Sequence, residues 1–275
     1  MMGENRAKIL TIRWPLLPLL WVVASSLSFG AGTTTRASAQ VQHTLAPTGA
    51  LRVALYTGTP TSLVSEHDLR GVGYELGREF ARRLGVPFQP LVYPRNADVL
   101  DAIKAGRADV AFTNATVERA KDMDFTAPYL IIELGYLVRE GGPVVKLTDV
   151  DRPGVRVGVS ANSTSDTLLT RRLKFARVVR ADTVAMGIRM LATRTIDVYA
   201  TNKATLFGMA RKVRGAKVLD GSWGQERHAL GLPKGRERGL PFAQAFIADA
   251  TATGFVQAAV KKADVQGAVV ANSSH

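Results

Sequence analysis

The sequence contains no cysteine among its 275 residues. A disulfide framework, thiolate catalysis, a cysteine-bound zinc or iron–sulfur centre and a lipoprotein anchor through cysteine are therefore excluded. The four histidines, His43, His67, His228 and His275, are far apart in the sequence, and they form no metal-ligand pattern. We accordingly expect no metal site and no cofactor.

The sequence also lacks a basic run interleaved with aromatic residues, which make up only 7% of the chain. Lys and Arg outnumber Asp and Glu by 36 to 23, a net charge of +13, but they are scattered. A nucleic-acid role thus has little support, whereas the charge suits anionic ligands or simply aids solubility. With 46% hydrophobic residues the chain can form one large domain or two small ones.

The first 39 residues have the pattern of a secretory signal peptide. Basic residues precede an apolar run over residues 14–23, and an A-x-A motif ends at Ala39. We expect cleavage after Ala39 and a periplasmic location. The alternative is a membrane anchor, but Pro15 and Pro18 interrupt the run, which is short for a span.

Strand and helix patterns alternate along the rest of the chain. We expect strands at 51–56, 87–93, 109–113, 155–159, 178–179, 196–201 and 218–219. We expect helices at 71–84, 96–105, 164–173, 182–192, 202–213, 240–253 and 255–263, the third, fourth and fifth capped by Ser163, Asp182 and Asn202. This alternation predicts two α/β units with parallel sheets.

Two longer extended segments, at 131–138 and 228–232, flank the second unit. They predict two lobes joined by two crossovers, with a cleft between the lobes. The expected organisation is as follows: signal peptide 1–39, flexible lead-in 40–50, first part of lobe 1 51–138, lobe 2 139–227, return to lobe 1 228–265, frayed tail 266–275.

The stretch from 109 to 129 contains a candidate anion site. A short apolar strand is followed by Thr113, Asn114 and Thr116, and then by Arg119. A guanidinium group pairs both oxygens of a carboxylate, and ligands in open α/β sheets lie at the carboxyl ends of strands. The alternative is an ordinary strand–loop–helix with Arg119 as a solvated surface charge.

Six short segments occur in the order and spacing of a known family. They are LRV at 51–53, GVGYE at 71–75, AGRAD at 105–109, TVERAKDMDFTAPY at 116–129, VGVSANST at 157–164 and IDVYATN at 196–202. Across about residues 51–265 the chain resembles the periplasmic solute-binding proteins of ABC importers, in the cluster that contains polar amino-acid binders.

The resemblance implies a two-lobed periplasmic-binding-protein fold of type II, with discontinuous lobes joined by two crossover strands. It also implies a monomer that closes on a small ligand and then docks on an ABC permease in the inner membrane. Closure of this kind is a population shift, driven by contacts made only when both lobes touch the ligand.

The resemblance further assigns the ligand site. Arg119 matches the arginine that pairs a ligand carboxylate. Ser163, Thr164 and Ser165 match the turn of the second lobe whose backbone N–H groups open a helix and can hold an anion. The expected ligand-binding residues are Tyr56, Thr57, Thr113, Asn114, Thr116, Arg119, Ser160, Ser163, Thr164, Ser165 and Asn202.

Three departures from the family pattern concern the ligand. Asn202 stands where amino-acid binders have an aspartate for the α-ammonium group. The aromatic clamp after the first strand is missing over 57–62, although Tyr56 can stack on a ligand or serve as a strand residue. The segment 109–119 is about two residues shorter than usual. These changes favour a small anionic, carboxylate-bearing ligand without an ammonium group.

Two other classes of function are weighed against solute binding. A few proteins of this fold are periplasmic enzymes, such as dehydratases of cyclic carboxylates, which need an acid or base in the cleft. The candidates are Glu66, His67, Asp68, Glu226 and His228, but isolated residues of this kind are usually loop or surface residues. A sensor module is the third class, and no kinase segment follows. We expect the protein not to be an enzyme.

Overall fold

The computed structural model of the protein describes residues 37–271, which belong to one compact unit. The predicted signal peptide lies outside the described residues except for its last three. Within the described part, no helix combines the length and the apolar character that a membrane span requires.

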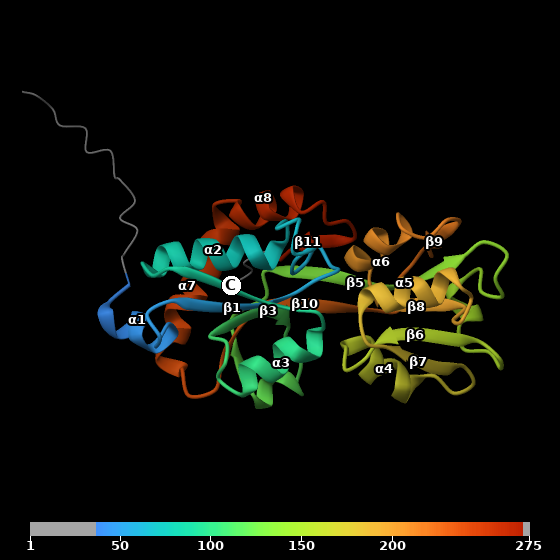
Figure 1. Ribbon diagram of the computed structural model, residues 1–275, viewed down its shortest axis with the longest axis horizontal. Helices are drawn as coiled ribbons and strands as arrows, with labels where there is room; N and C mark the ends of the chain where they lie inside the picture. The colour runs from blue at the N-terminus through green and yellow to red at the C-terminus, as the bar shows by residue number, and fades with distance from the viewer. Residues whose placement is uncertain (1–36, 272–275) are drawn as a thin grey trace, which may run out of the picture. The chain divides into compact units, whose positions relative to one another are not determined.

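The strands of the described residues form one mixed sheet in the order β2-β1-β3-β10-β5-β8-β6-β7 (Figure 1). The strands of one half are parallel: β1 (Leu51–Tyr56), β2 (Phe88–Tyr93) and β3 (Val110–Asn114). The strands of the other half are parallel as well: β6 (Arg156–Ser160), β7 (Arg177–Ala181) and β8 (Val198–Asn202). These halves are the sheets of lobe 1 and lobe 2.

Two ten-residue strands join the halves: β5 (Leu130–Arg139) and β10 (Gly224–Pro233). β10 runs antiparallel to β3 over 228–231 and to β5 over 224–228, while β5 runs antiparallel to β8 over 134–138. Each strand therefore contributes to both lobes. Three short strands lie beside this pair: β4 (Met123–Phe125) on β10, and β9 (Ala216–Val218) and β11 (Ala268–Val270) on β5. The predicted fold class, two lobes with two crossover strands, is confirmed.

Helices cover both faces of each half of the sheet (Figure 1). Lobe 1 contains α2 (Val72–Leu84), α3 (Asn96–Lys104), α7 (Leu240–Ala252) and α8 (Phe255–Lys262), and lobe 2 contains α4 (Thr164–Arg172), α5 (Val184–Ala192) and α6 (Lys203–Ala210). Three short 3₁₀ helices occur as well: η1 (Arg119–Lys121), η2 (Leu147–Asp149) and η3 (Glu237–Gly239).

Helix caps follow the local sequence. Ser163 and Asn202 cap α4 and α6, as expected. Helix α5 differs from the expectation, because its cap is Thr183 and not Asp182. The Thr183 hydroxyl accepts the N–H of Met186 at 3.0 Å.

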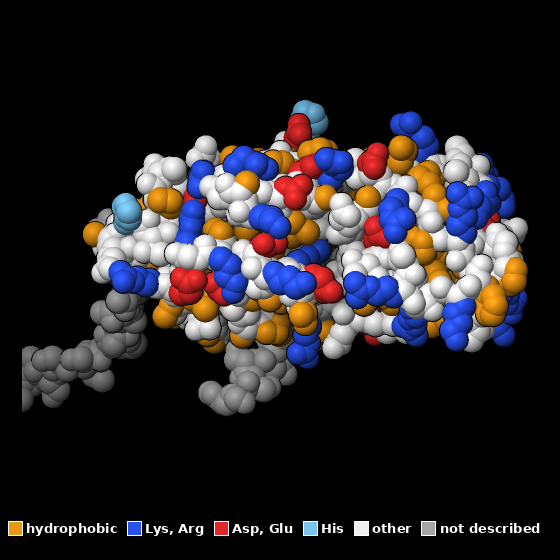
Figure 2. Space-filling view, turned by 90° about the horizontal axis from the view of Figure 1, so that it is seen from below, with side chains coloured by type: hydrophobic (Ala, Val, Ile, Leu, Met, Phe, Trp, Pro, Cys, Tyr) orange, Lys and Arg blue, Asp and Glu red, His pale blue; other side chains and the backbone are white. Residues whose placement is uncertain are grey.

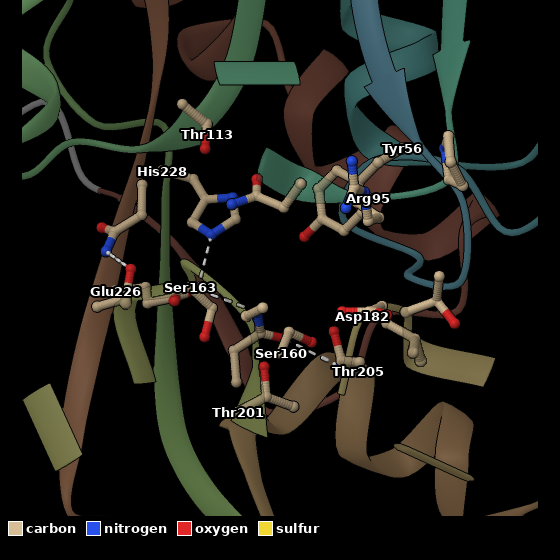
Figure 3. Close-up of a pocket in the computed structure, with 18 of the residues that line it drawn as sticks. Tyr56, Arg95, Thr113, Ser160, Ser163, Asp182, Thr201, Thr205, Glu226 and His228 are labelled. Carbon is tan, nitrogen blue, oxygen red and sulfur yellow. Dashed lines mark hydrogen bonds and ion pairs between the residues drawn. The ribbon is translucent and has the colours of Figure 1, made fainter. Parts of the chain in front are cut away.

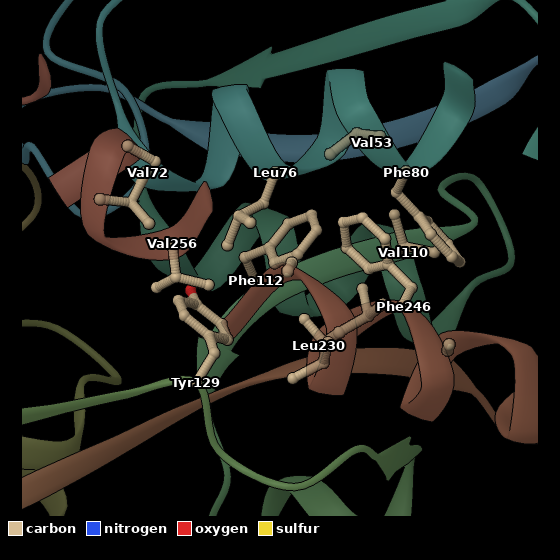
Figure 4. Packing of buried hydrophobic residues seen from close by; sticks show 14 of the residues in the cluster. Val53, Val72, Leu76, Phe80, Val110, Phe112, Tyr129, Leu230, Phe246 and Val256 are labelled. Atoms are coloured by element: carbon tan, nitrogen blue, oxygen red, sulfur yellow. The ribbon is translucent and has the colours of Figure 1, made fainter. Parts of the chain in front are cut away.

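The core of lobe 1 lies between the sheet and the α2, α7 and α8 layer (Figure 4). The ring of Phe80 of α2 packs at a tilt against Phe246 of α7 with ring centroids 4.8 Å apart, and the ring of Phe112 of β3 packs edge-on to Tyr129 with centroids 5.9 Å apart. Lobe 1 has a second, smaller cluster around Ile103 of α3, and lobe 2 has two clusters, one around Val157 and Leu169 and one around Tyr199.

The segment 40–50 is not the flexible lead-in expected from the sequence. It contains α1 (Ala39–Leu45), whose N-cap is Ser38. Leu45 is fully buried, and a Cβ atom at Gly239 would lie 2.4 Å from it. The helix forms because Val41 and Leu45 lie on one face, and their burial outweighs the weak propensity of a seven-residue helix.

The segment 266–275 also differs from the frayed tail that we expected. Its β-branched residues Val269 and Val270 belong to β11, which pairs antiparallel with β5 at 130–132. Residues 272–275 lie outside the described part of the chain.

Candidate functional site

A polar cavity lies where strands of both lobes end (Figure 3). Tyr56, Asn114, Ser160 and Asn202 are the last residues of β1, β3, β6 and β8, and all four line it. Parallel strands of an open α/β sheet place their carboxyl ends along one edge, where ligands bind. The cavity is therefore in the position that the fold favours for a ligand.

Arg119, at the start of η1, brings a positive charge to the cavity. Its Nη1 donates to the Thr113 hydroxyl at 2.7 Å and to the Asn114 carbonyl at 3.1 Å. Burial lowers the pKa of Arg119, while the negative charge of Glu226 raises it, and the guanidinium stays protonated. Among residues 37–271, Nε and Nη2 have no hydrogen-bond acceptor and no carboxylate lies within 4.0 Å of this side chain. These two donors can take both oxygens of a ligand carboxylate.

Glu226 brings a negative charge to the same cavity. It is 7% exposed, and its Oε2 accepts Asn202 Nδ2 at 3.0 Å and lies 2.9 Å from His228 Nε2. Burial raises the pKa of this carboxyl, but the hydrogen bond and charge of His228 and the charge of Arg119 lower it more, so its pKa falls below the ordinary value. Both hydrogen bonds go to Oε2, which leaves Oε1 without a partner in the described part of the chain.

His228 is buried beside Glu226. It is 4% exposed and lines the cavity, and its Nδ1 has no hydrogen-bond partner among the described residues. Glu226 and His228 lie two residues apart on β10, so their side chains share one face of the strand.

Direct contacts hold the two lobes together around the cavity. Asn114 Nδ2 of lobe 1 donates to Thr164 Oγ1 of lobe 2 at 3.0 Å, and Asn114 Oδ1 accepts the N–H of Arg227 at 2.7 Å. On a buried loop, Thr59 Oγ1 of lobe 1 lies 2.8 Å from Thr205 Oγ1 of lobe 2. The structure therefore represents a closed arrangement of the lobes.

The structure brings together most of the predicted ligand-binding residues. Those that line the cavity are Tyr56, Thr113, Asn114, Arg119, Ser160, Ser163, Thr164 and Asn202. Thr57, Thr116 and Ser165 do not line it. Thr57 forms a backbone bridge with Leu63, Thr116 accepts the N–H of Arg119 at the outer rim, and Ser165 is buried in helix α4. The ligand-binding roles of all eleven residues stay predictions.

The sequence predicts a ligand without an ammonium group because Asn202 carries no charge; the structure places the carboxylate of Glu226 beside Asn202, and the ligand class stays a prediction. Glu226 and His228 were weighed only as isolated enzyme candidates, and the structure instead buries them as a pair. Their two-residue spacing in an extended run was the available signal. Glu66 and His67 are exposed and Asp68 is partly buried, and none of the three lines the cavity. Arg95, Asp182 and Thr205 are further cavity residues that the sequence did not indicate.

Two lobes with a polar cavity between them are typical of solute-binding proteins. The chain belongs to the bacterial extracellular solute-binding proteins, family 3, whose model matches residues 51–263.

Individual relatives agree with this assignment. The chain is 25% identical over 250 residues to the L-cystine-binding protein TcyJ of Escherichia coli (strain K12). The alignment covers 89% of this chain and 93% of the relative. An L-arginine-bound amino acid ABC transporter substrate-binding protein of Streptococcus pneumoniae matches with a TM-score of 0.71 and 19% identity, over 81% of this chain and 98% of that one. An ancestral amino acid-binding protein, a precursor of cyclohexadienyl dehydratase, matches with a TM-score of 0.71 and 20% identity, over 80% and 98%.

Proposed function

We propose that this protein captures a small α-amino acid between its lobes in the periplasm and delivers it to an ABC importer in the inner membrane. The observation that carries the proposal is the pairing of free groups in one cavity. Arg119 offers two unused donors, and Glu226 offers one unused carboxylate oxygen. These charges are opposite, as the two ends of a zwitterion require.

Arg119 takes the carboxylate in this proposal. Its Nη1 is held by Thr113 and Asn114, so the guanidinium is oriented before the ligand arrives. A bidentate guanidinium–carboxylate pair is stronger than neutral hydrogen bonds, and partial burial strengthens it further. The start of α4 at Ser163 and Thr164 adds N–H groups on the lobe 2 side of the cavity.

Glu226 takes the ammonium group. Asn202 occupies the family's aspartate position, and its amide Nδ2 holds Oε2 of Glu226 at 3.0 Å. The negative charge is thereby supplied from the crossover strand β10 and not from the end of β8. The relatives named for binding cystine and arginine support a ligand of this class.

A second candidate is a carboxylate-bearing anion without an ammonium group. The observation that favours it is the contact between Glu226 and His228, which engages the carboxylate within the protein. In that case the cavity offers only Arg119 as a free charge. A third candidate, a dehydratase of cyclic carboxylates, draws on the match to a precursor of such an enzyme and on the buried Glu226–His228 pair.

The test is calorimetric binding of amino acids and of their des-amino analogues to the mature protein. We expect the amino acid to bind more tightly, and Arg119→Ala to weaken it by about a hundredfold or more. Glu226→Gln keeps the shape of the side chain. It should weaken the binding of the amino acid by at least about tenfold, while leaving the binding of the analogue unchanged. Glu66→Gln, at an exposed carboxylate of lobe 1 that does not line the cavity, is the matched control.

Each alternative has its own result. Equal affinity for the amino acid and its analogue, with Glu226→Gln neutral for both, would replace the zwitterion with the simple anion. Conversion of any bound compound, followed by mass spectrometry, would favour the enzyme. Unchanged binding in Arg119→Ala would overturn the assignment of the carboxylate site.

A further inference from the structure

Positive charge is concentrated in lobe 2. Residues 139–227, which contain β6 to β9 and α4 to α6, hold 17 Lys and Arg against 8 Asp and Glu. Residues 40–138 and 228–275 together hold 15 against 14. Figure 2 shows blue side chains gathered over the right-hand part of the molecule, where lobe 2 lies, and mixed blue and red over lobe 1. The excess of positive over negative charge therefore lies almost entirely in lobe 2.

An exposed aromatic residue lies among these cations, in the loop from α4 to β7. Phe175 is 64% exposed, and Arg172, Lys174 and Arg177 around it are exposed as well. No carboxylate lies within 4.0 Å of these three cations in the part of the chain that the structure describes. An adjoining turn carries Val145, which is 65% exposed, beside the exposed Lys146. We call these six residues the α4–β7 surface.

Two buried or half-buried aspartates fix the backbone of this surface. Asp151 accepts the N–H groups of Lys174, Phe175 and Ala176 at 2.8–3.1 Å, and Asp149 accepts those of Val145 and Lys146 at 3.1 Å. A loop without such bonds could turn its phenylalanine inward. Here the backbone is held by one neighbouring loop, so both apolar side chains stay outside among the cations.

We propose that the α4–β7 surface docks on the surface of an anionic phospholipid bilayer. Lys and Arg near such a surface are attracted by its negative potential, and an aromatic side chain between them inserts at the headgroup boundary. Protection of the edge strand β7 from pairing would account for Arg177, but it would not account for an exposed phenylalanine. Docking of this surface does not depend on which solute binds, because none of its six residues lines the solute cavity.

The experiment is co-sedimentation of the mature protein with vesicles of phosphatidylcholine, with and without phosphatidylglycerol. We expect binding only to the phosphatidylglycerol vesicles, and its loss at high salt. The double variant Lys174→Glu/Arg177→Glu should lower binding by about thirtyfold or more, because each cation near an anionic surface contributes. The matched control is Arg107→Glu/Lys121→Glu, which changes the net charge equally in exposed residues of lobe 1 and should change binding about twofold or less.

The apolar part is tested separately. Phe175→Ser should lower vesicle binding by about tenfold, whereas Leu69→Ser, at a residue of lobe 1 that is 48% exposed, should leave it unchanged. Equal losses in the two charge variants would reduce the effect to net charge and overturn the proposal. Binding of heparin without binding of vesicles would overturn it too, in favour of an acidic macromolecule. Thermal melting of each variant shows whether it is folded.

Discussion

The two lobes use the same ion pair to join their first and third strands. In lobe 1, Arg52 donates to Asp109 from its backbone N, Nε and Nη2 at 2.8, 3.1 and 2.7 Å. In lobe 2, Arg156 donates to Asp197 from the same three atoms at 2.8, 2.9 and 2.8 Å. Each aspartate directly precedes the parallel strand, β3 or β8. We call each of these two Arg–Asp ion pairs a clamp. The clamp is thus repeated in both half-sheets.

The surroundings of the two clamps differ. Asp109 is fully buried and also accepts Arg236 Nη1 at 2.7 Å, from the chain that returns to lobe 1. The Asp197 side chain is 13% exposed and that of Arg156 is 39% exposed. Arg236 also donates to the Leu45 carbonyl of α1, so the return and α1 pack around the lobe 1 clamp, whereas Arg156 is the one cation that pairs with Asp197 among the described residues. The same sequence device is therefore part of the core in one lobe and part of the surface in the other.

The largest effect is expected for Asp109→Ala. It leaves Arg52 and Arg236 without their carboxylate at sites where their side chains are 19% and 14% exposed. Removing one partner of a buried ion pair costs about 3–5 kcal/mol. Urea denaturation should therefore show a loss of this size in the free energy of unfolding.

Asp197→Ala is the matched control for that loss, because it removes the same clamp from lobe 2. We expect its effect to be less than half as large, since water can solvate Arg156. Equal losses in the two variants would show that burial by the return helices adds nothing to the clamp.

The next effect concerns a close helix–strand contact in each lobe. A Cβ at Gly187 of α5 would lie 2.3 Å from Tyr199, and one at Gly77 of α2 would lie 2.9 Å from Val53. Both alanine variants should lose stability, Gly187→Ala by about 2 kcal/mol. Only Gly187→Ala should also weaken solute binding, because the Tyr199 hydroxyl bonds at 2.7 Å to Ser160, which lines the cavity.

Calorimetric binding and thermal melting of both variants separate these effects. A loss of affinity in Gly77→Ala as large as in Gly187→Ala would mean that the cavity responds to general loosening. The pocket would then not depend on the core of lobe 2 in particular.

Local patterns predicted most helices and strands. Contacts between distant segments account for the elements that the sequence did not predict, such as α1 and β11. Ser163 and Asn202 were identified as caps because a cap depends on the next few residues. Helix α1 was missed because its support is Leu45 beneath Gly239, almost two hundred residues away.

The candidate site likewise contains a residue that the local sequence could place and a residue that it could not. Arg119 follows its own strand within a few residues, so the local sequence placed it near the cavity. The pairing of Glu226 with Asn202 depends on how β10 crosses between the lobes, where Glu226 aligns with Ile132 and His228 with Asn114. Spacing within one segment cannot give that register.

A smaller effect tests the contact that joins the two lobes. Thr59→Val removes the buried hydroxyl pair with Thr205, together with a hydroxyl pair to Thr61 inside lobe 1, while nearly conserving volume. Because the pair exists only when the lobes are together, its loss disfavours closure, and we expect solute affinity to fall about fivefold. Thr193→Val removes a hydroxyl pair with Thr195 inside lobe 2 and should leave the affinity unchanged. Isothermal titration of both variants decides between a closure effect and a general effect of losing a threonine pair.

The smallest expected effect is a pH-dependent loss of stability when the charge of Asp197 is removed from the lobe 2 clamp. The hydrogen bond from Arg156 holds the pKa of Asp197 below its ordinary value of 3.8. A carboxyl whose pKa is lower in the folded state stabilises the fold above its unfolded pKa, and this contribution is lost as pH falls through the folded pKa. Asp197→Asn should therefore be less stable than the wild type by about 1 kcal/mol at neutral pH, a value reduced by the exposure of Arg156.

The difference between the wild type and Asp197→Asn should shrink as pH falls below 3.8, which urea denaturation at several pH values measures. Asp220→Asn, at an exposed carboxylate of lobe 2 without an ion pair among the described residues, is the control and should show no such difference. A difference that persists unchanged in acid would mean that Asp197 acts through the shape of its hydrogen bonds and not through its charge.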